Sequence, residues 1–135
     1  MKQTLLFAIS LLLILGSCKN SNSQKSGKLF IKTTEVKGTG ENQVKKETVS
    51  EVNTDYFEVS LASQTTGGYL AQKDLVIPTS MEDFKSTFIT IVDQSENDIK
   101  FMTSTEFLNY MSGHGYEMVD QALNEYGGDY TFKKK

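Results

Sequence analysis

Residues 86–119, STFITIVDQSENDIKFMTSTEFLNYMSGHGYEMV, carry the secondary-structure signals that decide the fold. Residues 86–93 alternate along the chain and yet are largely apolar on both faces, which is typical of a strand inside a sheet. The polar residues 94–98 then form a turn, and residues 99–102 return as the partner of that strand. This half of the stretch therefore predicts two antiparallel neighbours.

The second half of the stretch predicts the main helix. Thr103 and Glu106 have the spacing of a capping box, in which each side chain satisfies a free backbone amide of the first turn. The apolar residues that follow share one face of such a helix: Phe107, Leu108 and Met111. Gly113 is placed to end the helix in a left-handed conformation, after which residues 116–123 run extended.

Outside this stretch, alternating apolar and polar residues predict further short strands. They lie at residues 29–34, 56–61 and 130–132, and the apolar residues 75–77, directly before Pro78, suit a strand end or an edge. Residues 43–53 have three valines among charged residues, a pattern that fits either an exposed strand or a mobile loop. Ser80 and Asp83 have the spacing to begin a helical turn over residues 81–84. The glycine pair at 127–128 predicts a hairpin turn before the last strand.

These elements predict an α+β fold, in which a small antiparallel β-sheet packs against one main α-helix. The C-terminal part forms a strand–helix–hairpin unit. A length of 135 residues leaves room for one globular domain, which we place at residues 28–135.

The N-terminal residues MKQTLLFAISLLLILGSC have the features of a secretory signal peptide. Lys2 provides the positive charge, and the apolar run over residues 5–15 is shorter than the roughly 20 residues that a membrane-spanning helix needs. The run ends in Leu15, Gly16, Ser17 and Cys18, which resemble the lipobox of bacterial lipoproteins.

The lipobox resemblance implies cleavage between Ser17 and Cys18 and attachment of a diacylglycerol to the Cys18 thiol. Two or three acyl chains give stable anchoring, so the membrane is the expected partner through Cys18. Residues 19–27 contain no apolar side chain and are expected to form a flexible tether. Lys19, where an aspartate commonly signals inner-membrane retention, favours the outer membrane, with the domain facing the periplasm. The predicted divisions are thus signal peptide 1–17, lipidated tether 18–27 and domain 28–135.

The C-terminal third is similar to an uncharacterised domain family of small bacterial proteins. The matching segments are LNYM at residues 108–111, GYE at 115–117 and YTFKK at 130–134. Members of that family share an "LNYM" helix, a "GWE" followed by aliphatic residues, and a closing "YxFKK" strand. Tyr116 stands here in place of the common tryptophan. The resemblance supports the strand–helix–hairpin architecture and carries no activity with it.

Composition excludes several classes of function. The formal net charge is −3, with 14 lysines and no arginine, which argues against a general affinity for nucleic acid. One histidine and one cysteine cannot build a zinc finger, an iron–sulfur site or a set of disulfides. We therefore expect no nucleic-acid partner, no metal site and no cofactor.

One loop resembles a calcium-binding loop but lacks required parts. Asp93, Ser95 and Asn97 have the alternate spacing of calcium ligands. Position six of the loop is Asp98 where a glycine is needed, and position twelve is Ser104 where a glutamate is needed. We interpret these residues as a structural turn.

Three other patterns are also interpreted as structural. Gly38 and Gly40 lack the third glycine and the following helix of a phosphate-binding loop. Glu82 and Asp83 are adjacent, so their carboxylates point apart and do not form a catalytic pair. His114 lies between two glycines where the turn after the helix is expected, and no nucleophile motif accompanies it. We therefore predict no catalytic residues.

Tyrosines provide the candidate binding surface, because rings with a polar tip are enriched at interfaces. Most of the six tyrosines are expected in the core or at its rim. The candidate binding face consists of residues near the helix and the last strand: Tyr110, His114, Tyr116 and Tyr130.

The sequence thus predicts a lipid-anchored protein of the cell envelope that acts as a non-catalytic binding or scaffolding module with an envelope protein as partner. Two alternatives stay open. The first is an inhibitor or immunity protein of the envelope, and the second is a small hydrolase that uses carboxylates.

Overall fold

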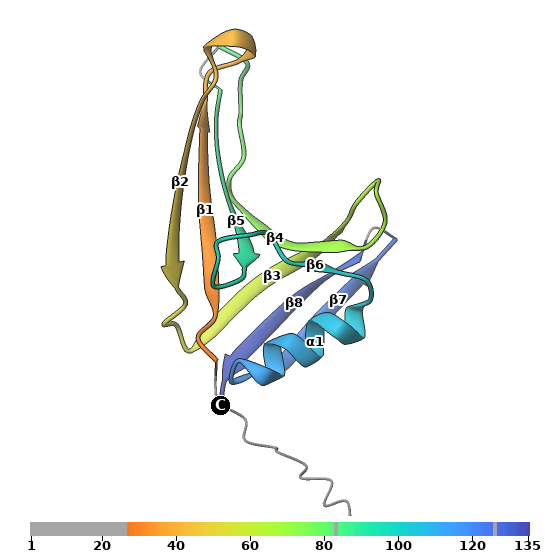
Figure 1. The fold of residues 1–135 in the computed structure, drawn as a ribbon. Helices are drawn as coiled ribbons and strands as arrows, with labels where there is room; N and C mark the ends of the chain where they lie inside the picture. The colour runs from red at the N-terminus through yellow and green to blue at the C-terminus, as the bar shows by residue number, and fades with distance from the viewer. Residues whose placement is uncertain (1–26, 83, 126) are drawn as a thin grey trace, which may run out of the picture.

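In the computed structural model, residues 27–82, 84–125 and 127–135 are described, and they form a strongly curved antiparallel sheet with a short α-helix (Figure 1). The strands are β1 (Phe30–Lys37), β2 (Val44–Glu51), β3 (Tyr56–Ser63), β4 (Tyr69–Val76), β5 (Lys85–Val92), β6 (Lys100–Phe101), β7 (Tyr116–Asn124) and β8 (Gly127–Lys134). The helices are the 3₁₀ turn η1 (Gly40–Asn42) and the α-helix α1 (Ser104–Gly113).

The predicted α+β class is wrong, because the described residues form a β-rich fold with eight strands and one ten-residue α-helix. Two strands account for most of the difference. Residues 44–51, left open between strand and loop, form β2, and the strand expected at 75–77 begins six residues earlier, at Tyr69. Six of the eight residues of β2 are exposed, so no buried face leaves an alternating pattern in its sequence.

The order of the strands in the sheet is β2-β1-β5-β4-β3-β8-β7, and β6 pairs with β4 off this path. The interior position expected for residues 86–93 is confirmed, since β5 lies between β1 and β4. Its predicted partner is wrong: residues 100–101 pair with Tyr69 and Leu70 of β4. The segment that follows β5 meets it through a single bridge, Val92 to Asp98.

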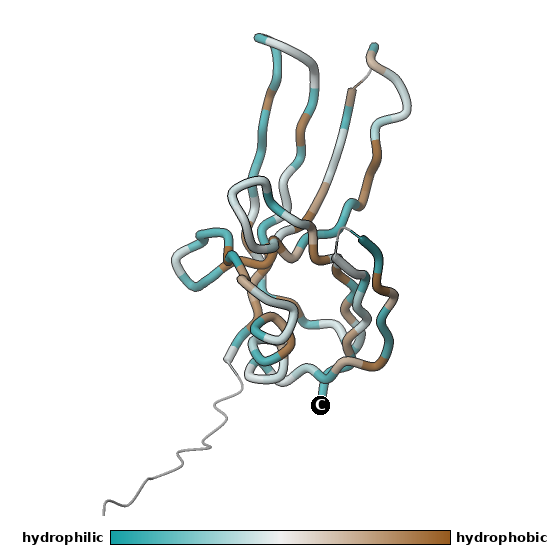
Figure 2. The backbone as a smooth tube through the Cα atoms, turned by 90° about the vertical axis from the view of Figure 1, so that its right-hand side faces the viewer, coloured by the Kyte–Doolittle hydropathy of each residue, from teal (hydrophilic) through white to brown (hydrophobic). Residues whose placement is uncertain are grey.

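Half of the sheet projects from the body of the protein as an arm. The arm comprises β1, β2, β5 and the end of β4, and Figures 1 and 2 show its two hairpin ends side by side, far from α1. β1 pairs along its whole length with both neighbours, from Phe30 opposite Glu51 and Val92 to Lys37 opposite Val44 and Lys85. The backbone amide of Gly38 donates to Phe84 O (2.9 Å), which joins the two hairpin ends.

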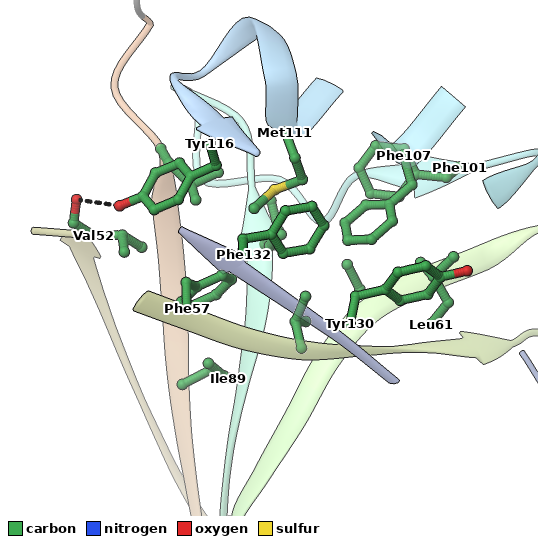
Figure 3. Packing of buried hydrophobic residues seen from close by; sticks show 14 residues of the cluster. Val52, Phe57, Leu61, Ile89, Phe101, Phe107, Met111, Tyr116, Tyr130 and Phe132 are labelled. Atoms are coloured by element: carbon green, nitrogen blue, oxygen red, sulfur yellow. Dashed lines mark hydrogen bonds between the residues drawn. The ribbon is translucent and has the colours of Figure 1, made fainter. Parts of the chain in front are cut away.

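The hydrophobic core lies under α1, where the helix covers the inner face of β8 and the short strand β6 (Figure 3). Phe107 is fully buried at its centre. Its ring makes edge contacts with three others, at centroid distances of 5.2–5.4 Å: Phe101, Tyr130 and Phe132. On the β3 side, the Tyr116 hydroxyl donates to Thr54 O (3.2 Å) and holds the β2–β3 connection against the start of β7.

The ends of α1 follow the sequence prediction in part. Thr103 Oγ1 accepts from Glu106 N (3.1 Å), and the Glu106 carboxylate accepts from Met102 N (2.8 Å), one residue before the amide that a capping box would use. The helix ends at Gly113 as expected, but the left-handed residue is Gly115, with φ +84°. Of residues 81–84, where a helical turn is expected, Met81 lies in a bend and Glu82 in a turn, and the described ones are not part of a helix.

The first prediction concerns the aromatic cluster. Replacing Phe107 by alanine removes three ring contacts and leaves a buried cavity, so Phe107→Ala should lower the free energy of unfolding by about 3–5 kcal/mol. Urea unfolding measures the change. Met102→Ala is the control, because this exposed side chain beside the same helix should change stability by less than about 0.5 kcal/mol. Equal effects of the two variants would contradict the proposed centre of the core.

The second prediction concerns the close approach of β8 to its neighbour β3 at Gly127. Gly127 has φ +145°, and a Cβ atom there would lie 2.0 Å from Leu61 O. Gly127→Ala should therefore destabilise the fold far more than Gly40→Ala. At Gly40 a Cβ would meet no atom within 4 Å, and the left-handed backbone alone should cost about 1–2 kcal/mol. Thermal unfolding of the two variants checks this ranking, and the reverse order would disprove the close approach.

Candidate functional site

The arm carries large apolar side chains that the fold leaves in solvent. We define the arm tip as the five residues of this kind in the distal half of the arm: Val44, Leu75, Val76, Ile77 and Met81. Between 42% and 78% of each residue is exposed. Val44 begins β2, while the other four belong to the end of β4 and its connection to β5. Four of the five fall within residues 75–81, and exposed apolar residues that lie close together mark interaction surfaces more often than single ones do.

A hollow of about 390 Å³ lies between the two hairpin ends of the arm. Its lining combines an aromatic ring, two cations and one anion: Lys37, Gly38, Glu82, Phe84 and Lys85. Gly38 adopts φ +79°, and a Cβ atom there would lie 2.7 Å from Asn42 O, so the tight β1–β2 turn requires glycine at this position. The tip therefore offers aliphatic surface and charges of both signs within one small region.

The first described residue and the C-terminal end of the chain lie at the end of the molecule opposite the arm tip (Figure 1). Gly27 and Lys134 line the same small hollow, together with His114 and Tyr116. A chain that is held at its N-terminal side thus presents the arm tip at its far end.

A second hollow, of about 340 Å³, lies on the outer face of β3, β8 and β7. Ser60 and Asp129 are opposite each other in the β3–β8 register, and their buried neighbours Val59 and Tyr130 point to the core, so both polar side chains face outward. We define the acidic hollow as this space. Its charged and hydroxyl-bearing lining residues include Glu58, Ser60, Lys73, Asp120 and Asp129.

Two side-chain hydrogen bonds organise the acidic hollow. The Ser60 hydroxyl donates to Asp129 Oδ1, and the Lys73 ammonium donates to Glu58 Oε2. Three carboxylates and one ammonium group leave a formal charge of −2 on these lining residues. His114, the chain's one histidine, is not among the residues that line this space, so no imidazole stands beside Ser60. The arrangement is suited to holding a cation, and the Ser60 hydroxyl is paired with a carboxylate and lacks the imidazole of a Ser–His pair.

The structure separates the four residues of the candidate tyrosine–histidine face. Tyr116 and Tyr130 are buried, with 2% and 3% exposure, and burial raises the pKa of both hydroxyls. Tyr110 and His114 lie together on the last turn of α1, with ring centroids 4.0 Å apart. His114 Nδ1 is 2.7 Å from Tyr110 O, and the residue forms the C-cap of α1, which confirms its expected place in the turn.

The loop with calcium-like spacing is a structural turn. Asp93 Oδ1 accepts backbone hydrogen bonds from Asn97 N (2.9 Å) and Ser95 N (2.8 Å), which hold the pKa of its carboxyl below the usual range. Asp98 binds Lys32 Nζ at 2.6 Å, and this hydrogen bond raises the pKa of Lys32. Within residues 27–82, 84–125 and 127–135, no group of three or more His, Cys, Asp or Glu side chains is arranged to hold a metal ion.

Several predicted features lie outside the described residues. They are the signal peptide with Leu15, Gly16 and Ser17, the lipidation site Cys18, the acidic residue Asp83 and the tyrosine Tyr126. In the part of the chain that the structure describes, no helix has the length and apolar character to cross a bilayer. The chain matches no protein-family model, no curated protein and no solved structure. The resemblances to lipoproteins and to the small-protein family therefore stay predictions.

The third prediction follows from the Asp93 turn. Because the folded state lowers the pKa of Asp93, its ionised carboxylate stabilises the protein above the unfolded pKa of about 3.9, and this contribution is lost as the pH falls through the folded value. Asp93→Asn should be less stable than the wild type at pH 7. The difference in unfolding free energy should shrink as the pH falls below about 4. Urea unfolding between pH 7 and pH 2 measures it.

Glu41→Gln, in the exposed turn η1, is the control for the Asp93 experiment. It should follow the wild-type curve more closely than Asp93→Asn does at neutral pH. A difference between Asp93→Asn and wild type that stays constant down to the lowest pH would contradict the role of the ionised carboxylate.

Proposed function

We propose that this chain is a lipid-anchored protein of the cell envelope, held in the outer membrane through Cys18 and facing the periplasm. We propose further that it acts there as a non-catalytic binding or scaffolding module, with the arm tip as its contact surface. The observation that carries the proposal is the position of the exposed apolar arm tip at the end opposite Gly27.

The tether length fits this arrangement. The eight residues 19–26 separate Cys18 from the first described residue, and a fully extended segment of that length spans at most about 28 Å. The lipidated end would thus hold the lower part of the body close to the bilayer. The arm tip would point away from that surface, where it can meet a partner that is not embedded in the same membrane.

The chemistry of the arm tip favours a protein as the partner. Aliphatic side chains and Met81 make dispersion contacts without directed hydrogen bonds, so they fit an apolar pocket on another protein. Lys37, Lys85 and Glu82 beside them supply a charged rim around the apolar contacts, as protein interfaces commonly have.

The inhibitor alternative draws support from the same feature. A hairpin pair that projects from the body has a shape suited to entering the cleft of an enzyme (Figure 2). The two functions differ in what the partner does. A stoichiometric partner enzyme whose activity falls on binding favours the inhibitor, and a partner with unchanged activity favours the scaffold.

The fourth prediction tests the anchor and the contact surface in living cells. Mass spectrometry of the mature N-terminus should show acylated Cys18 in the wild type, and Cys18→Ala should leave the membrane fraction. A photo-crosslinking residue placed at Ile77 or Met81 should capture one defined protein. The same residue placed at Met102, which is exposed on the body, should not capture it.

The double variant Ile77→Ser, Met81→Ser tests whether the arm tip makes the contact. Because both side chains are exposed, it should change the unfolding free energy by less than about 0.5 kcal/mol per site and yet lose the partner. An unmodified Cys18 would refute the anchor. The arm tip is not the contact surface if crosslinking from Met102 captures the partner as strongly as crosslinking from Ile77, or if the double variant still binds the partner.

A further inference from the structure

The two outer strands of the sheet differ in how they are protected. β2 carries Lys45, Lys46 and Glu47 in succession, and charged residues of this kind discourage another strand from pairing at an edge. β7 has no such run of charged residues. After the buried Tyr116, every residue of β7 is exposed, including three large apolar ones: Met118 (41%), Val119 (49%) and Leu123 (68%).

The free edge of β7 is regular over its second half. The register with β8 shifts between Met118 and Asp120, and from there five consecutive pairs run from Asp120 opposite Thr131 to Asn124 opposite Gly127. In the described part of the chain, β7 pairs with β8 on one side and with no strand on the other. Residues 120–123 therefore present a short row of outward backbone groups that another strand can join.

The acidic hollow lies directly beside this free edge. Asp120 and Ala122 of β7 line it, together with Asp129 of β8 and Glu58 of β3. β7 also carries Glu117 and has no Lys, Arg or His in its sequence. A strand added at the edge would thus run along carboxylates on one of its faces, and its other face would lie next to Leu123.

We propose that the free edge of β7 binds an extended peptide segment of another protein, in which basic and apolar residues alternate. The backbone of the segment adds one strand to the sheet, and a Lys or Arg side chain enters the acidic hollow and pairs with Asp120 and Asp129. Backbone hydrogen bonds supply the affinity and the alternate side chains supply the selection, as in other cases of strand addition. This inference does not depend on the lipid anchor or on the arm tip.

Charge decides between a basic peptide and a second copy of this chain. The β7 of a second copy carries the carboxylates of Glu117 and Asp120 and no Lys, Arg or His, so it offers no cation to the acidic hollow. It would add negative charge beside carboxylates that are already there. A basic segment meets the same carboxylates with the opposite charge.

The fifth prediction tests the free edge with defined peptides and the folded protein labelled with ¹⁵N. A blocked heptapeptide that alternates lysine and valine should shift the amide signals of residues 119–124. The same peptide with glutamate in place of lysine should not shift them. Asp120→Asn should weaken binding by about two- to fivefold, the range measured for exposed charge pairs. Glu41→Gln, at the distant η1 turn, should leave binding unchanged.

Two methylated peptides separate strand addition from simple charge attraction. N-methylation of every second amide removes the donors on one side of an extended peptide, so one of the two alternately methylated forms should lose binding and the other should keep it. The proposal is overturned by equal binding of both forms, by signal shifts outside β7 and the hollow, or by no binding at about 1 mM peptide. It is also overturned if sedimentation shows self-association through β7 that the peptide does not disturb.

Discussion

The structure depends on the burial of Phe107 by α1 against the inner face of the sheet. The Phe107 ring contacts Phe101 on β6 and two aromatic rings on β8, so the helix, the short strand before it and the last strand meet around one side chain. Here the sheet has a second layer that excludes water from a large apolar surface. Thr103, which caps α1, sets where the helix begins and therefore which residue reaches this position.

The arm is built on a different principle, because none of the described elements forms a second layer over its distal half (Figure 1). Its order comes from the continuous pairing of β1 with both β2 and β5 and from the bond between Gly38 N and Phe84 O. Cross-strand pairs contribute less per residue than a buried core does. The arm is thus ordered by its backbone ladders and by its attachment to the body, and the apolar residues at its tip take no part in the hydrophobic core.

The sequence predicted the parts of the fold in which one face is buried. Phe57, Val59 and Leu61 alternate because β3 packs on the core, and the helix start at Thr103 could be placed from its cap. β2 could not be assigned, because a strand exposed on both faces carries no such period. The predicted fold class is wrong because the helix has a clear pattern in the sequence and the exposed strands do not.

The candidate surfaces were harder to predict than the strands. Tyr116 and Tyr130 have amphipathic rings that suit an interface, and pairing and burial place them in the core. The acidic hollow brings Glu58 together with Asp120 and Asp129 through the β3–β8 register and the bulge in β7, neither of which has a local signal. The arm tip does have one: residues 75–77 are three consecutive apolar residues just before Pro78, where the sequence predicts a strand end or an edge.

The mismatch in size between helix and sheet explains why the fold leaves two surfaces open. α1 runs alongside β7 and β8 (Figure 1), and a helix with its side chains is about 10–12 Å wide, whereas seven strands in one path span about 29 Å across the sheet before curvature. One such helix therefore covers less than half of the sheet. The exposed side chains of the uncovered part must be polar or must contact another molecule. Along β2 most of them are polar, whereas Ile77 and Met81 are apolar. At the other edge of the sheet, the second half of β7 is exposed, including its apolar residue Leu123. The exposed apolar residues of both candidate surfaces thus lie where α1 does not bury them.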